Sequence, residues 1–160
     1  MATRDAEPVF VDTNVLVYAH VAEAPWHQEA QQAIVAHETA GAPLWVSRQV
    51  LREYLVSLTR PQQFPIPPSL ETVVAQVRQM QRRFRVADEG PEVTTRLLAL
   101  VTEIPTYGRR IHDANIVATM LVYGIPRLRT NNPDDFDRFA TLIEVLPLVP
   151  PAAPPPPPEV

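Results

Sequence analysis

The sequence contains no cysteine, and its basic residues include no lysine. Without cysteine, disulfide bonds and thiolate metal sites are excluded, and a reducing cytoplasm is the expected compartment. No apolar run approaches the roughly 20 residues that a transmembrane helix needs. The polar, mixed-charge residues 1–8 do not have the pattern of a signal peptide. We therefore expect a cytoplasmic protein without a membrane partner.

All 14 basic residues are arginine, and the formal net charge is -4. This balance does not exclude a nucleic-acid-binding protein, because clustered carboxylates lower the total while arginines can still gather on one face. The exclusive use of arginine fits a codon bias of the genome, and it also suits phosphate contacts. A chain of 160 residues is long enough for one domain with a proper core.

Short apolar runs alternate with longer helical patterns along the chain. Strands are predicted at residues 9–11, 44–46, 86–87, 128–130 and 142–146. Helices are predicted over residues 15–37 with a break at Pro25, after Ser47, and at residues 70–84, 92–103 and 111–123. This alternation predicts an α/β fold with a parallel sheet of about five strands and helices on both faces, a three-layer α/β/α arrangement.

The end of the chain differs in composition from the rest. Residues 147–160 are mostly proline, and such a segment cannot build a core of its own. We expect a folded domain at residues 1–146 and a polyproline-like, disordered tail at residues 147–160.

Acidic residues stand after predicted strands or at the start of predicted helices. Asp12 follows the first strand, Glu53 lies one turn into the next helix, Asp113 begins a later helix, and Asp134 and Asp135 follow the fourth strand. In an open parallel sheet such positions face one edge, where unpaired carboxylates would repel one another. A divalent cation relieves that repulsion, and an all-oxygen ligand set favours Mg²⁺, or Mn²⁺, over zinc.

A cation held by carboxylates indicates phosphodiester chemistry, here the in-line hydrolysis of a nucleic-acid backbone to a 5′-phosphate and a 3′-hydroxyl. Asp12 and Asp113 are expected to bind the metal directly, and Glu53 to orient or deprotonate the attacking water. Asp135, or Asp134, would hold a second metal or its water. Taken alone, Asp113 could instead satisfy free amides in the first turn of its helix.

Polar and basic residues flank these acids. Four side chains are placed to hydrogen-bond the carboxylates, and two of them could also touch substrate: Thr13, Asn14, Thr130 and Asn132. The arginines beside the acids are the best candidates for phosphate contacts: Arg109, Arg110, Arg127 and Arg129. His112 could ligate a softer metal, although a histidine at a helix start is more often a surface or capping residue.

The order of four motifs carries more information than any one of them. They are VFVDTNVLVYA at residues 9–19, SRQVLREY at 47–54, HDANIVAT at 112–119 and RLRTNNPDDF at 127–136. In this order the sequence resembles the PIN-domain family, and within it the VapC-type toxins of bacterial toxin–antitoxin pairs, over residues 9–145. The acids of the family match Asp12, Glu53 and Asp113.

The fourth acid departs from the family pattern. Members often have an aspartate two residues after the threonine that matches Thr130, and this chain has Asn132 there. Asp135, just before Phe136, matches another recurrent position of the family. Either Asp135 fills the fourth role or the second metal site is weak.

The resemblance implies a parallel sheet in the order 3-2-1-4-5 and a Mg²⁺-dependent endoribonuclease. It further implies a homodimer and a cognate, VapB-like antitoxin that blocks the acidic pocket in a heterotetramer or larger assembly. Toxins of this type usually cut structured RNA.

Three other interpretations remain open at the level of sequence. A phosphatase resembling the haloacid dehalogenases would use Asp12 as a nucleophile, but Asn14 replaces its usual second aspartate and the chain has no lysine. A degenerate PIN fold could bind RNA without cutting it. A PIN nuclease could also serve a housekeeping role without an antitoxin, and a neighbouring reading frame for an antitoxin would distinguish that case.

Overall fold

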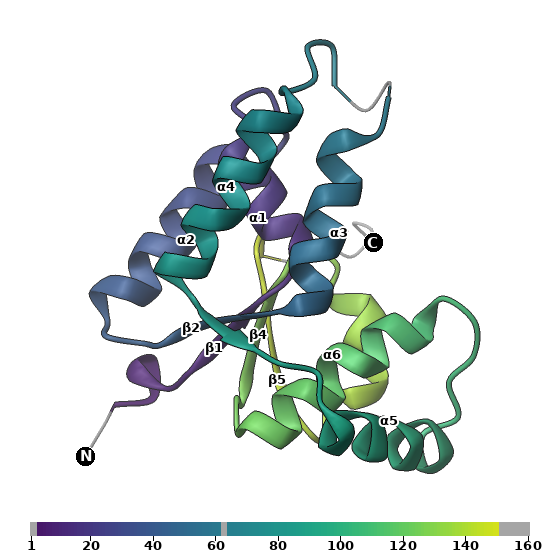
Figure 1. The fold of residues 1–160 in the computed structure, drawn as a ribbon. Coiled ribbons are helices and arrows are strands. Elements are labelled where there is room, and N and C mark those ends of the chain that lie inside the picture. Colours follow the sequence, from purple (N-terminus) through teal and green to yellow (C-terminus); the bar gives the residue numbers. More distant parts are fainter. Residues whose placement is uncertain (1–2, 62–63, 151–160) are drawn as a thin grey trace, which may run out of the picture.

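The computed structural model describes residues 3–61 and 64–150, and its centre is a five-stranded parallel sheet in the order β3-β2-β1-β4-β5 (Figure 1). The middle strand is β1 (Val9–Val11), whose three side chains are fully buried. Its neighbours are β2 (Leu44–Ser47) and β4 (Arg127–Thr130), and the edges are β3 (Arg85–Ala87) and β5 (Glu144–Pro147). The α/β class, the parallel pairing and the strand order expected from the sequence are confirmed.

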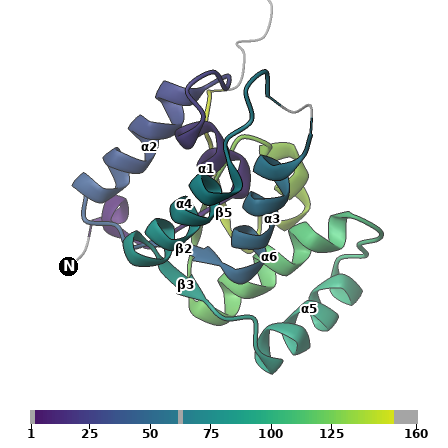
Figure 2. The ribbon, with the colours of Figure 1, turned by 45° about the horizontal axis from the view of Figure 1, so that its top comes forward.

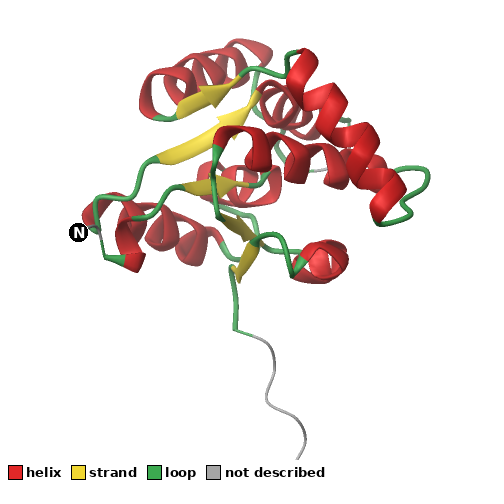
Figure 3. Cartoon of the chain, turned by 90° about the horizontal axis from the view of Figure 1, so that it is seen from below, coloured by secondary structure: helices red, strands yellow, loops and turns green. Residues whose placement is uncertain are grey.

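Helices cover both faces of this sheet (Figures 1 and 3). Over one face lie α1 (Thr13–His20), α2 (His27–Thr39) and α4 (Leu70–Arg83). Over the other lies α6 (Arg110–Tyr123), with α5 (Pro91–Glu103) packed along its outer side. The remaining helix, α3 (Arg48–Thr59), follows β2 and packs against α1 and α4. Short 3-10 helices are formed by η1 (Arg4–Ala6) and η2 (Pro133–Phe139).

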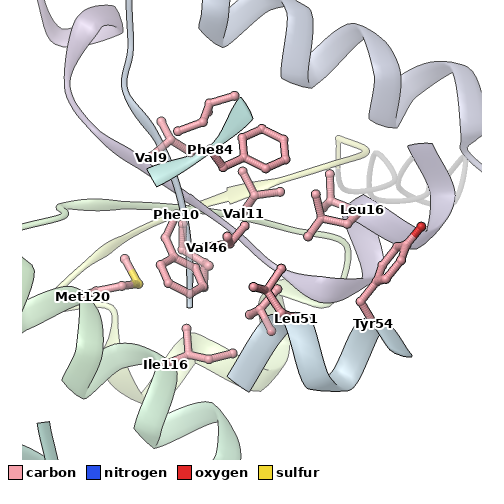
Figure 4. Packing of buried hydrophobic residues seen from close by; sticks show 14 of the residues in the cluster. Val9, Phe10, Val11, Leu16, Val46, Leu51, Tyr54, Phe84, Ile116 and Met120 are labelled. Atoms are coloured by element: carbon pink, nitrogen blue, oxygen red, sulfur yellow. The ribbon is translucent and has the colours of Figure 1, made fainter. Parts of the chain in front are cut away.

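Alternation along β1 distributes its side chains between the two layers of helices (Figure 4). Phe10 points toward Ile116 and Met120 of α6, whereas Val9 and Val11 point to the opposite face. This core fixes β1 rigidly, so the residue that follows it, Asp12, is placed by a buried strand rather than by a loose loop.

The first helix begins two residues earlier than the apolar pattern predicts, at Thr13. Asp12 caps it, because Oδ1 of Asp12 accepts a hydrogen bond from the Thr13 amide at 2.8 Å. The helix ends at His20, well before Pro25, and Trp26 adopts a left-handed conformation with φ of 62° just before α2. A break near Pro25 is therefore confirmed.

The last strand starts later than predicted. The amides of Leu142 and Ile143 donate to the carbonyl of Phe139 at 2.9 and 3.1 Å, which keeps both residues in a turn after η2. The strand therefore begins at Glu144 and includes Pro147. Its successor, Leu148, is buried and donates from its amide to the Thr130 carbonyl at 2.8 Å, so packing extends past the domain end expected at residue 146.

The predicted tail falls mostly at residues 151–160, outside the described part of the chain. Among residues 3–61 and 64–150, none of the helices is long and apolar enough to cross a bilayer.

Candidate active site

Four acidic side chains from four separate elements line one pocket of about 390 Å³ at the carboxyl edge of the sheet. Asp12 comes from the end of β1, Glu53 from α3, Asp113 from the first turn of α6, and Asp135 from η2. Helices α1 and α3 lie side by side at this edge (Figure 2). The predicted convergence of these positions follows from the parallel topology, which brings strand ends and helix starts to one edge.

Asp12 is the most enclosed of the four, with only 8% of its surface exposed. Its Oδ2 accepts hydrogen bonds from Thr130 Oγ1 at 2.8 Å and from Asn14 Nδ2 at 3.3 Å. Burial raises the pKa of Asp12 from 3.8 to about 6, and the nearby Glu53 and Asp135 carboxylates add to the rise, although hydrogen bonds from Thr130 and Thr13 oppose it. The Asp12 carboxylate is thus held in place by hydrogen bonds, but its nearest charged neighbours are other carboxylates.

Glu53 is held at both of its oxygens. Oε2 accepts a hydrogen bond from Thr13 Oγ1 at 2.9 Å, and Oε1 accepts one from Gln49 Nε2 at 2.8 Å. Thr13 belongs to α1 and Gln49 lies one turn earlier on α3. The orientation of Glu53 is therefore set from two helices.

Asp113 and Asp135 complete the acidic lining. Burial raises the pKa of Asp113 from 3.8 to about 6, and repulsion from Asp135, Asp12 and Glu53 adds to the rise more than Arg110 offsets it. Of the two adjacent acids in η2, Asp135 lines the pocket, whereas Asp134 is exposed and is not part of that lining.

Three of the four predicted supporting side chains hydrogen-bond a carboxylate of the pocket: Thr130 and Asn14 bond Asp12, and Thr13 bonds Glu53. Thr130 is fully buried. Its Oγ1 donates a hydrogen bond to Asp12 and accepts one from the backbone amide of Asn132 at 3.0 Å. Asn14 lies on α1, and its Oδ1 accepts a hydrogen bond from the backbone amide of Asn131 at 3.0 Å. Together with Thr13, these contacts tie the end of β1 to the loop after β4.

The chemistry of this pocket fits a hard divalent cation. Four of the five charged side chains that line it are carboxylates, with Arg60 as the fifth. The pKa values of Asp12 and Asp113 are raised because both groups are buried beside other acids. Within residues 3–61 and 64–150, no three His, Cys, Asp or Glu side chains are grouped so as to hold an ion by themselves. A cation here would therefore use one or two carboxylates and keep several waters, the usual habit of Mg²⁺.

Two of the predicted phosphate contacts adjoin the acids. Arg109 and Arg110 line a second hollow of about 510 Å³ with Tyr107, and Asp113 and Asp135 belong to both hollows. Positive charge and an exposed aromatic ring thus lie directly beside the carboxylates.

The other two arginines do not reach the acidic pocket. Arg127 is buried and donates from Nη2 to the carbonyls of Asp5 and Glu7, at 3.0 and 2.6 Å. Arg129 donates to His37 Nε2 and to the Pro147 carbonyl. Both side chains lie on the face of β4 opposite to Leu128. There they bond the backbone near η1 and in β5, and they are not among the residues that line the acidic pocket.

Sequence reasoning missed several residues of the site. Gln49 is 5% exposed and contacts Glu53, and its position four residues before Glu53 on the same helix was the available signal. Tyr18, Ser57 and Arg60 also line the acidic pocket. His112 is exposed and is not among the residues that line it.

The strand order 3-2-1-4-5 and the carboxylates at one edge of the sheet make this chain an α/β protein with an acidic pocket. The family model of the PIN domain matches residues 9–142. The chain therefore belongs to the PIN-domain family, as its four motifs indicated. No curated protein matches the sequence significantly.

Several solved structures share the fold at low sequence identity. A chain of the Rickettsia felis VapBC2 complex, bound to a promoter DNA fragment, is 20% identical with a TM-score of 0.65, over 87% of this chain and 97% of that one. Mycobacterium tuberculosis VapC20, a sarcin-ricin loop cleaving toxin, is 19% identical with a TM-score of 0.61, over 83% and 94%. DNA-bound VapBC of Salmonella typhimurium is 15% identical with a TM-score of 0.64, over 89% and 99%.

Proposed function

We propose that this protein is a Mg²⁺-dependent endoribonuclease and the toxin of a VapC-like toxin–antitoxin pair. The observation that carries the proposal is the convergence of Asp12, Glu53, Asp113 and Asp135 in one pocket. Such a set has no evident structural purpose, since like charges gathered at a buried edge destabilise the fold unless a cation joins them.

A bound divalent cation would lower the pKa of water and neutralise charge on the scissile phosphodiester. Asp12 and Asp113 would hold the cation, and Mn²⁺ could replace Mg²⁺. Glu53 would orient the attacking water and accept its proton, and Asp135 would support a second cation or an ordered water. The water oxygen would bond to phosphorus as the P–O3′ bond breaks, and the leaving 3′-oxygen would take a proton from solvent, which gives a 5′-phosphate and a 3′-hydroxyl.

The partners of this chain are proposed from its similarity to VapC-type toxins. Similar structures include VapBC complexes with DNA and FitAB bound to DNA. We expect a VapB-like antitoxin encoded beside this gene, a homodimer of the toxin, and a heterotetramer or larger assembly of the two proteins. Co-purification with the product of the neighbouring reading frame, followed by mass determination of the complex, tests this expectation.

The first test of activity is the incubation of purified protein with total bacterial RNA. Discrete fragments are expected with Mg²⁺ and none with EDTA, and the new ends should be 5′-phosphate and 3′-hydroxyl. A protein that binds RNA but leaves it intact under all metal conditions would instead be a non-catalytic RNA-binding PIN domain. Cleavage without any antitoxin gene nearby would favour a housekeeping nuclease.

Substrate contact by Arg109 and Arg110 can be tested separately from catalysis. The double change Arg109→Ala/Arg110→Ala should weaken RNA binding on the order of tenfold in low salt, and it should reduce the dependence of affinity on salt, because fewer phosphates are neutralised. Binding is measured by filter retention across a salt series.

A matched control for that experiment is Arg78→Ala/Arg82→Ala, which removes two exposed arginines of α4, neither of which is among the residues lining the two hollows. Equal loss of RNA affinity in both double variants would mean that general charge, and not the arginines beside Asp113, drives binding.

A further inference from the structure

We infer that Gln49 is a positioning residue, which holds Glu53 in the acidic pocket with a side chain that is itself fixed by the first turn of α6. This inference deepens the proposed function and, in its kinetic part, rests on it. The carboxylate of Glu53 accepts from Gln49 Nε2 at 2.8 Å. The same nitrogen donates to the carbonyl of His112 at 2.9 Å, and His112 directly precedes Asp113. One side chain therefore touches the two helices that carry Glu53 and Asp113.

The amide of Gln49 has only one orientation that satisfies its neighbours. Its nitrogen faces a carboxylate and a backbone carbonyl, which are both acceptors, and its oxygen accepts from Asn115 Nδ2 at 2.7 Å. A flipped amide would place oxygen against two acceptors and nitrogen against a donor. The side chain is thus locked by three partners and cannot rotate away from Glu53 without losing them.

A second layer of contacts anchors this arrangement from outside. The carboxylate of Glu89 accepts from the Gln49 backbone amide at 2.9 Å and from Asn115 Nδ2 at 2.8 Å. Glu89 lies just before α5, so it connects the start of α3 to α6. Gln49 bonds Oε1 of Glu53 and Thr13 bonds Oε2, and the two contacts together leave the Glu53 carboxylate little freedom.

A polar residue at this place has a cost that packing alone does not explain. Gln49 is 5% exposed, and an apolar side chain of the same length would fill the space without needing three hydrogen-bond partners. An apolar residue would lose the donor to Glu53, together with the bonds to the His112 carbonyl and Asn115 that hold this donor in place. Groups that orient a metal-site carboxylate in this way commonly contribute about 10- to 100-fold to activity or metal affinity.

The test compares Gln49→Met with Gln31→Met. Methionine keeps the length and helix preference of glutamine but cannot donate a hydrogen bond. Gln31 also donates to a backbone carbonyl, that of Ala19 at 3.1 Å, on the α1–α2 side of the protein. We expect Gln49→Met to lower kcat by about tenfold or more with KM within about twofold, and Gln31→Met to leave both constants unchanged. A Gln49→Met enzyme with wild-type kcat would overturn the inference.

A double-mutant cycle separates positioning from a general loss of structure. In a Glu53→Ala background, Gln49 has no carboxylate to hold, so Gln49→Met should change the residual cleavage rate by less than about twofold. A purely structural role predicts the same fractional loss in both backgrounds, and that result would contradict the inference.

Crystal structures of the wild type and Gln49→Met provide a readout that does not depend on cleavage. We expect Glu53 to turn away from its place beside Thr13 in the variant, and an unmoved carboxylate would overturn the inference. If the wild type cuts no RNA, the proposed function fails, and this comparison still decides the role of Gln49.

Discussion

Replacing Asp12 by asparagine is expected to lower RNA cleavage on the order of 1,000-fold while the protein remains folded. Asparagine has the shape of aspartate and can still accept the Thr13 amide hydrogen bond made by Oδ1. It lacks the negative charge that a divalent cation needs from its most buried ligand. The rate is measured under single-turnover conditions with saturating Mg²⁺, so that weaker RNA binding does not contribute.

The matched control is Asp137→Asn, which makes the same chemical change at an exposed position of η2 that does not line the acidic pocket. This variant should cleave RNA like the wild type. Comparable activity of Asp12→Asn and Asp137→Asn would show that the carboxylate at the end of β1 is not part of the catalytic site.

The second large effect concerns stability without metal. Burial raises the folded-state pKa of Asp12 from 3.8 to about 6, so between about pH 4 and pH 6 the folded protein binds this proton more tightly than the unfolded chain does. The contribution of Asp12 to the free energy of unfolding therefore falls as pH rises through this window. A rise from 3.8 to about 6 corresponds to a loss on the order of 2–3 kcal/mol once Asp12 is ionised.

Urea unfolding in EDTA isolates this contribution when the wild type and Asp12→Asn are compared at several pH values. The variant has no group to titrate at residue 12, so its stability relative to the wild type should increase from about pH 4 to pH 7. Added Mg²⁺ should stabilise the wild type more at neutral pH than at about pH 5, since protonated carboxylates bind cations poorly. A stability difference that is independent of pH would contradict the raised pKa of Asp12.

The fold was largely predictable because its signals are local and regular. The buried strand at Val9–Val11 is a short apolar run, and the apolar stripes of α3 and α4 have the periodicity of a helix. The gathering of Asp12, Glu53 and Asp113 was predictable too, since parallel topology brings the carboxyl ends of strands to one edge.

Side-chain partners were less predictable, because they depend on contacts between distant segments. Arg129 is close in sequence to Thr130, which contacts Asp12, and was therefore expected near the acidic pocket. Alternation along β4 instead turns its side chain to the face of the sheet where His37 lies. Gln49 is an ordinary helix residue in the sequence, and its role emerges only when α6 places the His112 carbonyl and Asn115 against it. The later start of β5 likewise depends on the turn that Phe139 closes.

Whether Asp12, Glu53, Asp113 and Asp135 form a divalent-cation site can be seen directly by anomalous scattering from crystals soaked in Mn²⁺. We expect an anomalous peak in the pocket, in contact with the carboxylates of Asp12 and Asp113, and no such peak in Asp12→Asn crystals. A saturating Mn²⁺ soak that leaves this pocket without a peak, or places the ion away from both aspartates, would contradict this expectation.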